Sequence, residues 1–175
     1  MKAEGGGRKA EDDTAGLPPS AFPPPPSRGR VAGIDYGTVR IGVAIGDLEV
    51  RMASPFETYE RRSKDIDAEY FKNLAEEERL VRWVVGLPVH LSGEESQKSF
   101  EARQFGKWLI ELTGLPVDFY DERFTSAYAE SMLAEANLTR DQRKARIDQL
   151  AAQIMLTAYL ESGAKGQTDP GSLED

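Results

Sequence analysis

Short apolar runs bounded by glycine, proline and charged residues predict five β-strands in the central part of the chain. The first strand ends at an aspartate. The second alternates branched residues with glycine and alanine, so one of its faces is almost bare and favours close packing of a helix or another backbone. The predicted strands are Val31–Asp35, Ile41–Gly46, Phe56–Tyr59, Leu80–Gly86 and Val117–Tyr120.

Apolar residues spaced three or four positions apart predict helices between and after these strands. The first predicted helix covers residues 64–78, and the second follows a loop at 88–93 and stops at Gly114. Two more helices are expected at 126–136 and 144–161, with a polar connection, Asn137 to Gln142, between them.

This order of elements predicts an α/β domain built on a five-stranded mixed sheet. The first three strands are expected to be antiparallel neighbours, and the later alternation of strands and helices places helices on both faces. We expect the domain to span residues 29–161. Residues 1–28, rich in proline and glycine, form a predicted disordered tail, and residues 162–175 form a flexible acidic tail. The proline run is either a stiff spacer or a ligand for a partner's aromatic groove.

Composition narrows the class of protein. The absence of cysteine excludes a disulfide scaffold and a cysteine-ligated zinc module. No apolar run reaches the roughly 18 residues of a membrane span, so we expect a cytoplasmic protein without a membrane segment. Of the net charge of −8, residues 29–160 carry −5. This mild negative charge argues against an open basic surface that binds duplex DNA. It still allows a local basic strip beside a carboxylate cluster.

Several carboxylates lie at the ends of predicted strands, where binding and catalytic sites of α/β sheets are usually found. Asp35 ends the first predicted strand, Asp121 and Glu122 follow the last, and Asp148 lies in the first turns of the final helix. Three converging carboxylates repel one another, so such a cluster typically binds hard divalent cations. One magnesium ion, or a pair about 3.5–4 Å apart, would then serve phosphodiester cleavage.

Each of these acids also has a simpler interpretation. Asp35 precedes a Tyr-Gly turn and could bond the backbone of that turn. Asp148 could favour the dipole at a helix start. The apolar stripe predicted for the final helix, Ile147, Leu150, Ala151, Ile154 and Ala158, places Asp148 at the edge of the buried face.

Basic residues near these acids are candidate phosphate contacts. Arg40 and Arg123 flank the carboxylates and could either hold phosphate or neutralise the acids. The densest basic segment contains Arg140, Arg143, Lys144 and Arg146, and it is either a strip for a nucleic-acid backbone or a solvated helix start. The single histidine, His90, is either an exposed loop residue or a phosphate contact.

Four motifs in this order resemble the YqgF (RuvX) family, the Holliday-junction-resolvase-like group of the RNase H-like superfamily, also described as pre-16S rRNA nucleases. The resemblance covers residues 29–161. The motifs are the segment from Arg30 to Asp47 with Asp35-Tyr-Gly37, then Val85-Gly86-Leu-Pro88 with Gly93, then Asp121-Glu122-Arg123-Phe-Thr125-Ser126, and finally Ile147-Asp148-Gln-Leu-Ala151-Ala152.

The resemblance implies an RNase H-like fold and a cytoplasmic nuclease that matures the 5′ end of small-subunit ribosomal RNA. It assigns Asp35, Glu122 and Asp148 as catalytic ligands of Mg²⁺ or Mn²⁺. The residues alone leave open whether Asp121 or Glu122 is the second ligand. Thr125 and Ser126 stand where the family has two threonines, so a capping or phosphate-contact role is expected for them. Phe124 departs from the family's leucine and alters only packing.

The expected partners are nucleic acid, as precursor ribosomal RNA or branched DNA, and pre-ribosomal particles. The protein would act as a monomer or a homodimer. Competing hypotheses are a resolvase of branched DNA and a non-catalytic RNA-binding or ribosome-assembly module. A sugar kinase or actin-like ATPase also has an Asp-x-Gly hairpin, but it needs a second phosphate loop and a second domain, which 133 residues do not supply.

Overall fold

The computed structural model describes residues 28–88, 96–122 and 137–164, with the side chains of residues 143–149 left out. Several predictions concern segments outside these described residues. They are the tail before residue 28, the end of the acidic tail, the helix at 126–136, His90, Arg123, Thr125 and Ser126.

Five strands form one mixed sheet in the order β3-β2-β1-β4-β5. Strands β1, β2 and β3 are antiparallel neighbours, whereas β4 pairs parallel to β1 and β5 parallel to β4. The predicted five-stranded mixed sheet and its antiparallel meander are therefore confirmed. The strands span Arg30–Asp35 (β1), Arg40–Asp47 (β2), Met52–Glu60 (β3), Leu80–Leu87 (β4) and Val117–Asp121 (β5).

The third strand is longer than the sequence predicted. It begins at Met52, four residues before the expected start, and it includes Pro55. Proline lacks the N–H that a central strand needs, but β3 lies at the edge of the sheet, where proline is tolerated. The pairing with β2 shifts register between Val43 and Ala44, opposite Glu57 and Pro55.

Helices α1 (Lys64–Glu77), α2 (Gln97–Thr113) and α4 (Arg140–Glu161) complete the described fold. Ser63 and Ser96 cap the first two, each with a side-chain oxygen that accepts a backbone N–H of the first turn. Gly114 ends α2 in the left-handed conformation, with φ of 71°, which glycine adopts without the steric cost of a Cβ atom.

The final helix starts earlier than predicted. The sequence interpretation treated Asn137 to Gln142 as a connection and began the helix at Lys144, whereas α4 begins at Arg140. A capping box explains the difference. The Thr139 hydroxyl accepts the N–H of Gln142, and the Gln142 side chain accepts the N–H of Thr139 at 3.0 Å.

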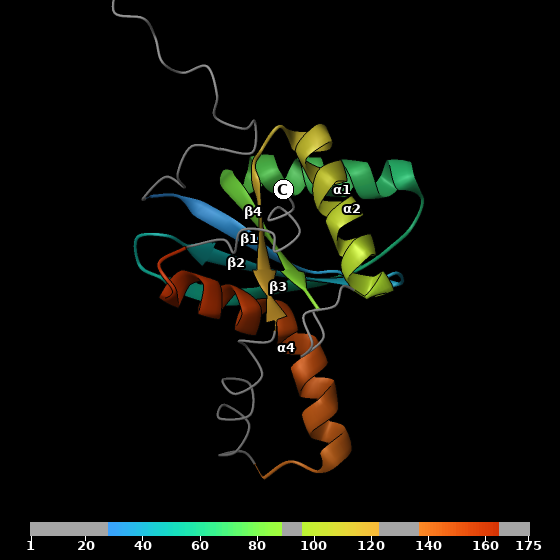
Figure 1. The fold of residues 1–175 in the computed structure, drawn as a ribbon, viewed down its shortest axis with the longest axis vertical. Coiled ribbons are helices and arrows are strands. Elements are labelled where there is room, and N and C mark those ends of the chain that lie inside the picture. Colours follow the sequence, from blue (N-terminus) through green and yellow to red (C-terminus); the bar gives the residue numbers. More distant parts are fainter. Residues whose placement is uncertain (1–27, 89–95, 123–136, 165–175) are drawn as a thin grey trace, which may run out of the picture.

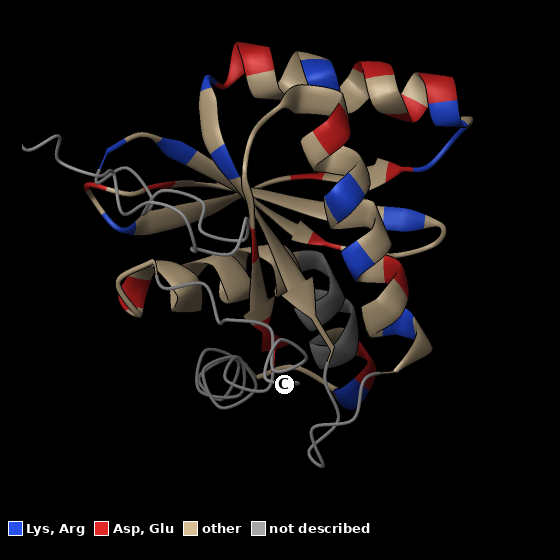
Figure 2. Ribbon diagram, turned by 45° about the horizontal axis from the view of Figure 1, so that its top comes forward, with Lys and Arg blue, Asp and Glu red and all other residues tan. Residues whose placement is uncertain are grey.

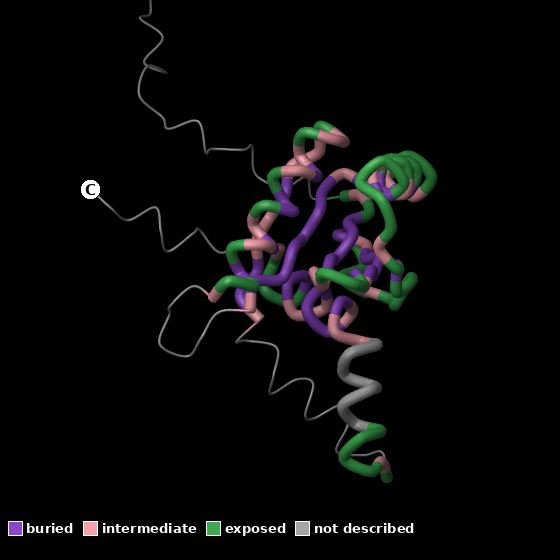
Figure 3. The backbone as a smooth tube through the Cα atoms, turned by 90° about the vertical axis from the view of Figure 1, so that its right-hand side faces the viewer, coloured by how far each residue is buried: buried purple, intermediate pink, exposed green. Residues whose placement is uncertain are grey.

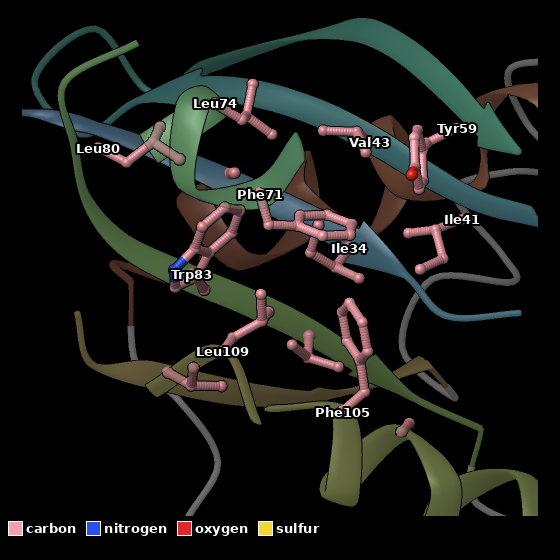
Figure 4. Close-up of a cluster of buried hydrophobic side chains, with 14 of the residues drawn as sticks. Ile34, Ile41, Val43, Tyr59, Phe71, Leu74, Leu80, Trp83, Phe105 and Leu109 are labelled. Atoms are coloured by element: carbon pink, nitrogen blue, oxygen red, sulfur yellow. The ribbon is translucent and has the colours of Figure 1, made fainter. Parts of the chain in front are cut away.

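Helices cover both faces of the sheet, as predicted: α1 and α2 lie on one side and α4 on the other (Figure 1). The core under α1 and α2 is rich in aromatic rings, with Phe71 edge-on to Trp83 and Phe105. Figure 4 shows these rings beside aliphatic residues of β1 and β2, including Ile34 and Ile41.

The second core lies between the sheet and the C-terminal half of α4. Its helix residues include Ala152, Met155, Leu156 and Tyr159. Of the predicted stripe, Ile154 is also buried, whereas Leu150, Ala151 and Ala158 are half-buried, so the buried face is only partly the predicted one. The predicted bare face of the second strand accounts for the contact, because a Cβ atom at Gly46 would come within 2.9 Å of Leu160 Cδ1. Position 148 lies in α4, four residues and about one helical turn before Ala152.

None of the described helices combines the length and apolar character that a membrane span requires.

Candidate active site

Asp35 is the last residue of β1, at the carboxyl end of a parallel pair of strands. It pairs with Gly42 of β2. A Cβ atom at Gly42 would lie 3.4 Å from Asp35 Cβ and 3.5 Å from Ala152 Cβ, so the aspartate, strand β2 and helix α4 meet at one point. The Asp35 side chain therefore lies on the α4 face of the sheet.

Glu122 follows β5 directly and reaches the same face over Gly86 of β4. A Cβ atom at Gly86 would lie 2.5 Å from Glu122 Oε1 and 3.2 Å from both Cδ and Cγ of that side chain. The space that any other residue would fill at position 86 is thus occupied by the carboxylate. This close approach is a physical reason for glycine at this position.

The charges of Asp35 and Glu122 act on each other. Burial and the negative charge of Asp35 together raise the pKa of Glu122 to about 7. Asp121, which is buried, adds a smaller effect in the same direction, and the exposed Lys98 of α2 acts in the opposite direction. The two predicted acids are therefore close enough to be coupled.

Asp148, the third predicted acid, lies in α4, one helical turn before Ala152. Its side chain is outside the described part of the structure. Among the described residues, no group of three or more histidine, cysteine, aspartate or glutamate side chains is arranged to hold a metal ion. Of the three predicted ligands, Asp35 and Glu122 are those whose side chains the structure describes.

Two of the predicted basic residues, Arg40 and Arg140, have described side chains. Arg40 is exposed at the start of β2, opposite Glu60 of β3. Arg140 is exposed at the start of α4, twelve residues before Ala152 and hence about 18 Å away along the helix axis. This end of α4 stands away from the buried centre of the molecule (Figure 3). The side chains of Arg143, Lys144 and Arg146 are not described.

Two contributors to the site were missed by the sequence analysis. Gly86 belongs to a quoted motif but had no assigned role, and its role follows from the contact with Glu122. Lys98 had no signal at all, because the α2 sequence does not show which of its exposed lysines faces an acid. Figure 2 shows acidic and basic residues interspersed along α1 and α2.

Residues 29–162 match the RuvX family, which is described as Holliday junction resolvase. The chain belongs to this family. Two relatives align with most of this chain. A "Putative pre-16S rRNA nuclease" of Rhodopirellula baltica is 47% identical over 151 residues, which are 86% of this chain and 87% of the relative. A protein of the same name from Syntrophomonas wolfei is 38% identical over 138 residues, covering 79% of this chain and 98% of the relative.

Solved structures give a weaker likeness than the RuvX relatives do. RuvC of T. thermophilus in complex with Holliday junction substrate aligns with a TM-score of 0.46 and 18% identity, over 77% of this chain and 96% of that chain. The yeast mitochondrial Holliday junction resolvase Ydc2 aligns with a TM-score of 0.47 and 14% identity, over 81% of each chain.

Proposed function

We propose that this RuvX protein is a metal-dependent nuclease that hydrolyses phosphodiester bonds at the 5′ end of precursor 16S ribosomal RNA. The observation that carries the proposal is the coupling of Asp35 and Glu122 at the strand ends, on the face that α4 covers. The family is described as Holliday junction resolvase and the relatives are named as pre-16S rRNA nucleases, and both descriptions support hydrolysis of a nucleic-acid backbone. The proposed substrate places the activity in the cytoplasm, with pre-ribosomal particles as partners.

We expect Asp35, Glu122 and Asp148 to hold Mg²⁺ or Mn²⁺. The described donors fit such an ion, because carboxylate oxygens are the ligands that hard cations prefer. The coupling also fits, because a divalent cation would offset the repulsion that raises the pKa of Glu122. When bound, the metal would activate water and stabilise the leaving oxygen of the cleaved bond.

The residues of the chain itself fix where this chemistry takes place. The β1 register places Asp35 opposite Gly42, and Gly86 leaves room for Glu122. We assign phosphate binding to the basic and hydroxyl residues that the sequence predicted for it. They are Arg40, Arg123, Thr125, Ser126, Arg140, Arg143 and Lys144.

Cleavage of precursor 16S RNA by the purified full-length protein, with Mg²⁺ or with EDTA, tests the proposal. We expect cleavage only with metal, and losses of more than about a hundredfold in Asp35→Asn and Glu122→Gln, because each variant removes a charged ligand and retains its shape. The matched controls Asp65→Asn and Glu111→Gln change exposed acids elsewhere and should cleave normally. Folded Asn and Gln variants that cleave at the wild-type rate would refute the assignment of these two acids, whereas no cleavage by the wild-type protein with Mg²⁺ would favour a non-catalytic binding module.

A second candidate function is the resolution of branched DNA, which the family description favours. A four-way DNA junction in the same assay separates the two. Symmetric resolution needs two active sites, so a resolvase should form a homodimer on the junction, whereas the ribosomal nuclease can act as a monomer. Cleavage of the junction without cleavage of the RNA would replace the first function by the second.

A further inference from the structure

A pocket of about 340 Å³ opens on the opposite face of the sheet from α4, beside the end of β1. Tyr36, the residue after Asp35, forms one of its walls. The other walls come from the segment that leads into α1 and from the exposed side of α2. The pocket therefore adjoins the candidate active site and uses none of the acids assigned to it.

Aromatic rings line one side of this pocket. The rings of Tyr36 and Phe105 have centroids 5.2 Å apart, and those of Phe105 and Trp108 lie 5.3 Å apart. Tyr36 and Trp108 are half-buried, so part of each ring is accessible from the pocket. The rings are tilted by 41° from one to the next, so each accessible face of Tyr36 and Trp108 offers a separate apolar surface to another planar ring.

A guanidinium group is fixed beside these rings. Arg61 places its Cζ atom 5.5 Å from the centre of the Tyr36 ring and donates from Nη1 to the Tyr36 hydroxyl at 3.1 Å. Its Nε atom pairs with Asp67 at 3.3 Å. The buried Asp67 carboxylate also accepts the hydroxyl of Tyr59 at 2.7 Å and the backbone N–H of Arg62 at 2.9 Å. These bonds hold Arg61 in place before any ligand arrives.

The open side of the pocket carries excess positive charge. Asp67 is compensated by Arg61, which leaves the exposed Arg62 and Lys64 against the single acid Glu101. Accessible aromatic faces, a fixed guanidinium and exposed cations are the combination that binds the bases and phosphates of single-stranded nucleic acid.

We propose that this pocket receives one unpaired base of the substrate strand, with Arg62 and Lys64 contacting the adjoining phosphates. The inference rests on the proposed nuclease function and adds the requirement for an unpaired nucleotide next to the cleavage site. Its position fits this role. Tyr36 follows Asp35 directly, and Glu101 at the pocket lies one turn along α2 from Lys98, which acts on Glu122.

Tryptophan fluorescence can report on the pocket directly. The chain has two tryptophans: Trp83 is fully buried, and Trp108 lines the pocket. Titration of the full-length protein with single-stranded RNA of about 12 nucleotides, in EDTA to prevent cleavage, should quench the emission. The quenching should be absent in Trp108→Phe, and blunt duplex RNA should not produce it.

The cations are tested by a matched pair of surface variants. We expect Lys64→Ala to bind the single strand about tenfold more weakly and to show a salt slope smaller by about one, because one phosphate contact is lost. Lys107→Ala removes an exposed lysine of α2 outside the pocket and should bind within about twofold of wild type.

Three outcomes would overturn the inference. They are equal binding by the two lysine variants, strand binding that leaves the Trp108 emission unchanged, and a nucleoside monophosphate that quenches as strongly as the strand. These results are independent of cleavage. Failure of the proposed nuclease function would instead appear as no metal-dependent cleavage by the wild-type protein, whatever the pocket binds.

Discussion

Replacing Gly86 by alanine should lower the rate of cleavage without lowering the stability of the fold. The new Cβ atom would lie 2.5 Å from Glu122 Oε1, whereas ordinary non-bonded contacts are about 3.5 Å, so the carboxylate must move by about 1 Å. A displacement of this size in a catalytic group can cost about a hundredfold in rate. We therefore expect Gly86→Ala to lose about two orders of magnitude in cleavage rate.

The same substitution should change stability little. Glycine within a strand is less favourable than alanine by roughly 0.5–1 kcal/mol, which offsets part of the steric cost. The atom that must move belongs to the end of a side chain rather than to the backbone. We expect the melting temperature to stay within a few degrees of wild type, about 1 kcal/mol or less in stability.

The assay measures cleavage rate against Mg²⁺ concentration alongside a thermal melt. Gly106→Ala is the matched control, because its new Cβ atom would lie 2.6 Å from Phe119 Cζ, a similar overlap inside the core under α2. That variant should lower the melting temperature and keep its rate at a temperature where it is folded. Wild-type cleavage by Gly86→Ala would refute the assignment of Glu122 as a catalytic ligand at this position.

Two further predictions concern polar groups in the two cores. Burial raises the pKa of Asp67, but hydrogen bonds from Arg62, Tyr59 and Arg61 outweigh it and hold the pKa below its ordinary value. The resulting stabilisation should be complete above about pH 4 and lost as the pH falls through the folded-state pKa. Acid-dependent melts of wild type and Asp67→Asn should therefore converge toward low pH, and a constant difference would contradict this. Tyr159→Phe removes a 2.5 Å hydrogen bond to Asp118 and should cost about 2 kcal/mol in urea unfolding; an unchanged midpoint would show that the bond contributes nothing net.

Local sequence patterns were sufficient for the elements of the sheet and for part of the site. Apolar runs predict the strands because a strand buried on both faces has few polar positions, as in β4. The two acids Asp35 and Glu122 could be paired in advance because the carboxyl ends of parallel strands meet at one edge. The motifs then identified the family before any contact was known.

Predictions from the sequence pattern were wrong or incomplete where a neighbouring element of the fold decides the structure. The strand predicted from Phe56 begins earlier and includes Pro55, because an edge strand does not need the N–H group that proline lacks. The predicted apolar face of α4 is only partly the buried one, because several rows of that helix are apolar and the bare face of β2 packs against the row through Ala152. The start of α4, in contrast, was predictable from the sequence alone, because Thr139 and Gln142 have the residue types and spacing of a capping box.

The sequence by itself determined which side chains could do chemistry, since carboxylates, arginines and glycines are readable at their positions. Only the tertiary structure decided that Glu122 lies over Gly86, that Lys98 acts on it, and that Tyr36, Arg61 and Trp108 enclose a pocket. The physical reason is that these contacts join residues far apart in the chain. Their distances depend on how the helices pack across the sheet, and periodicity within one element carries no information about that packing.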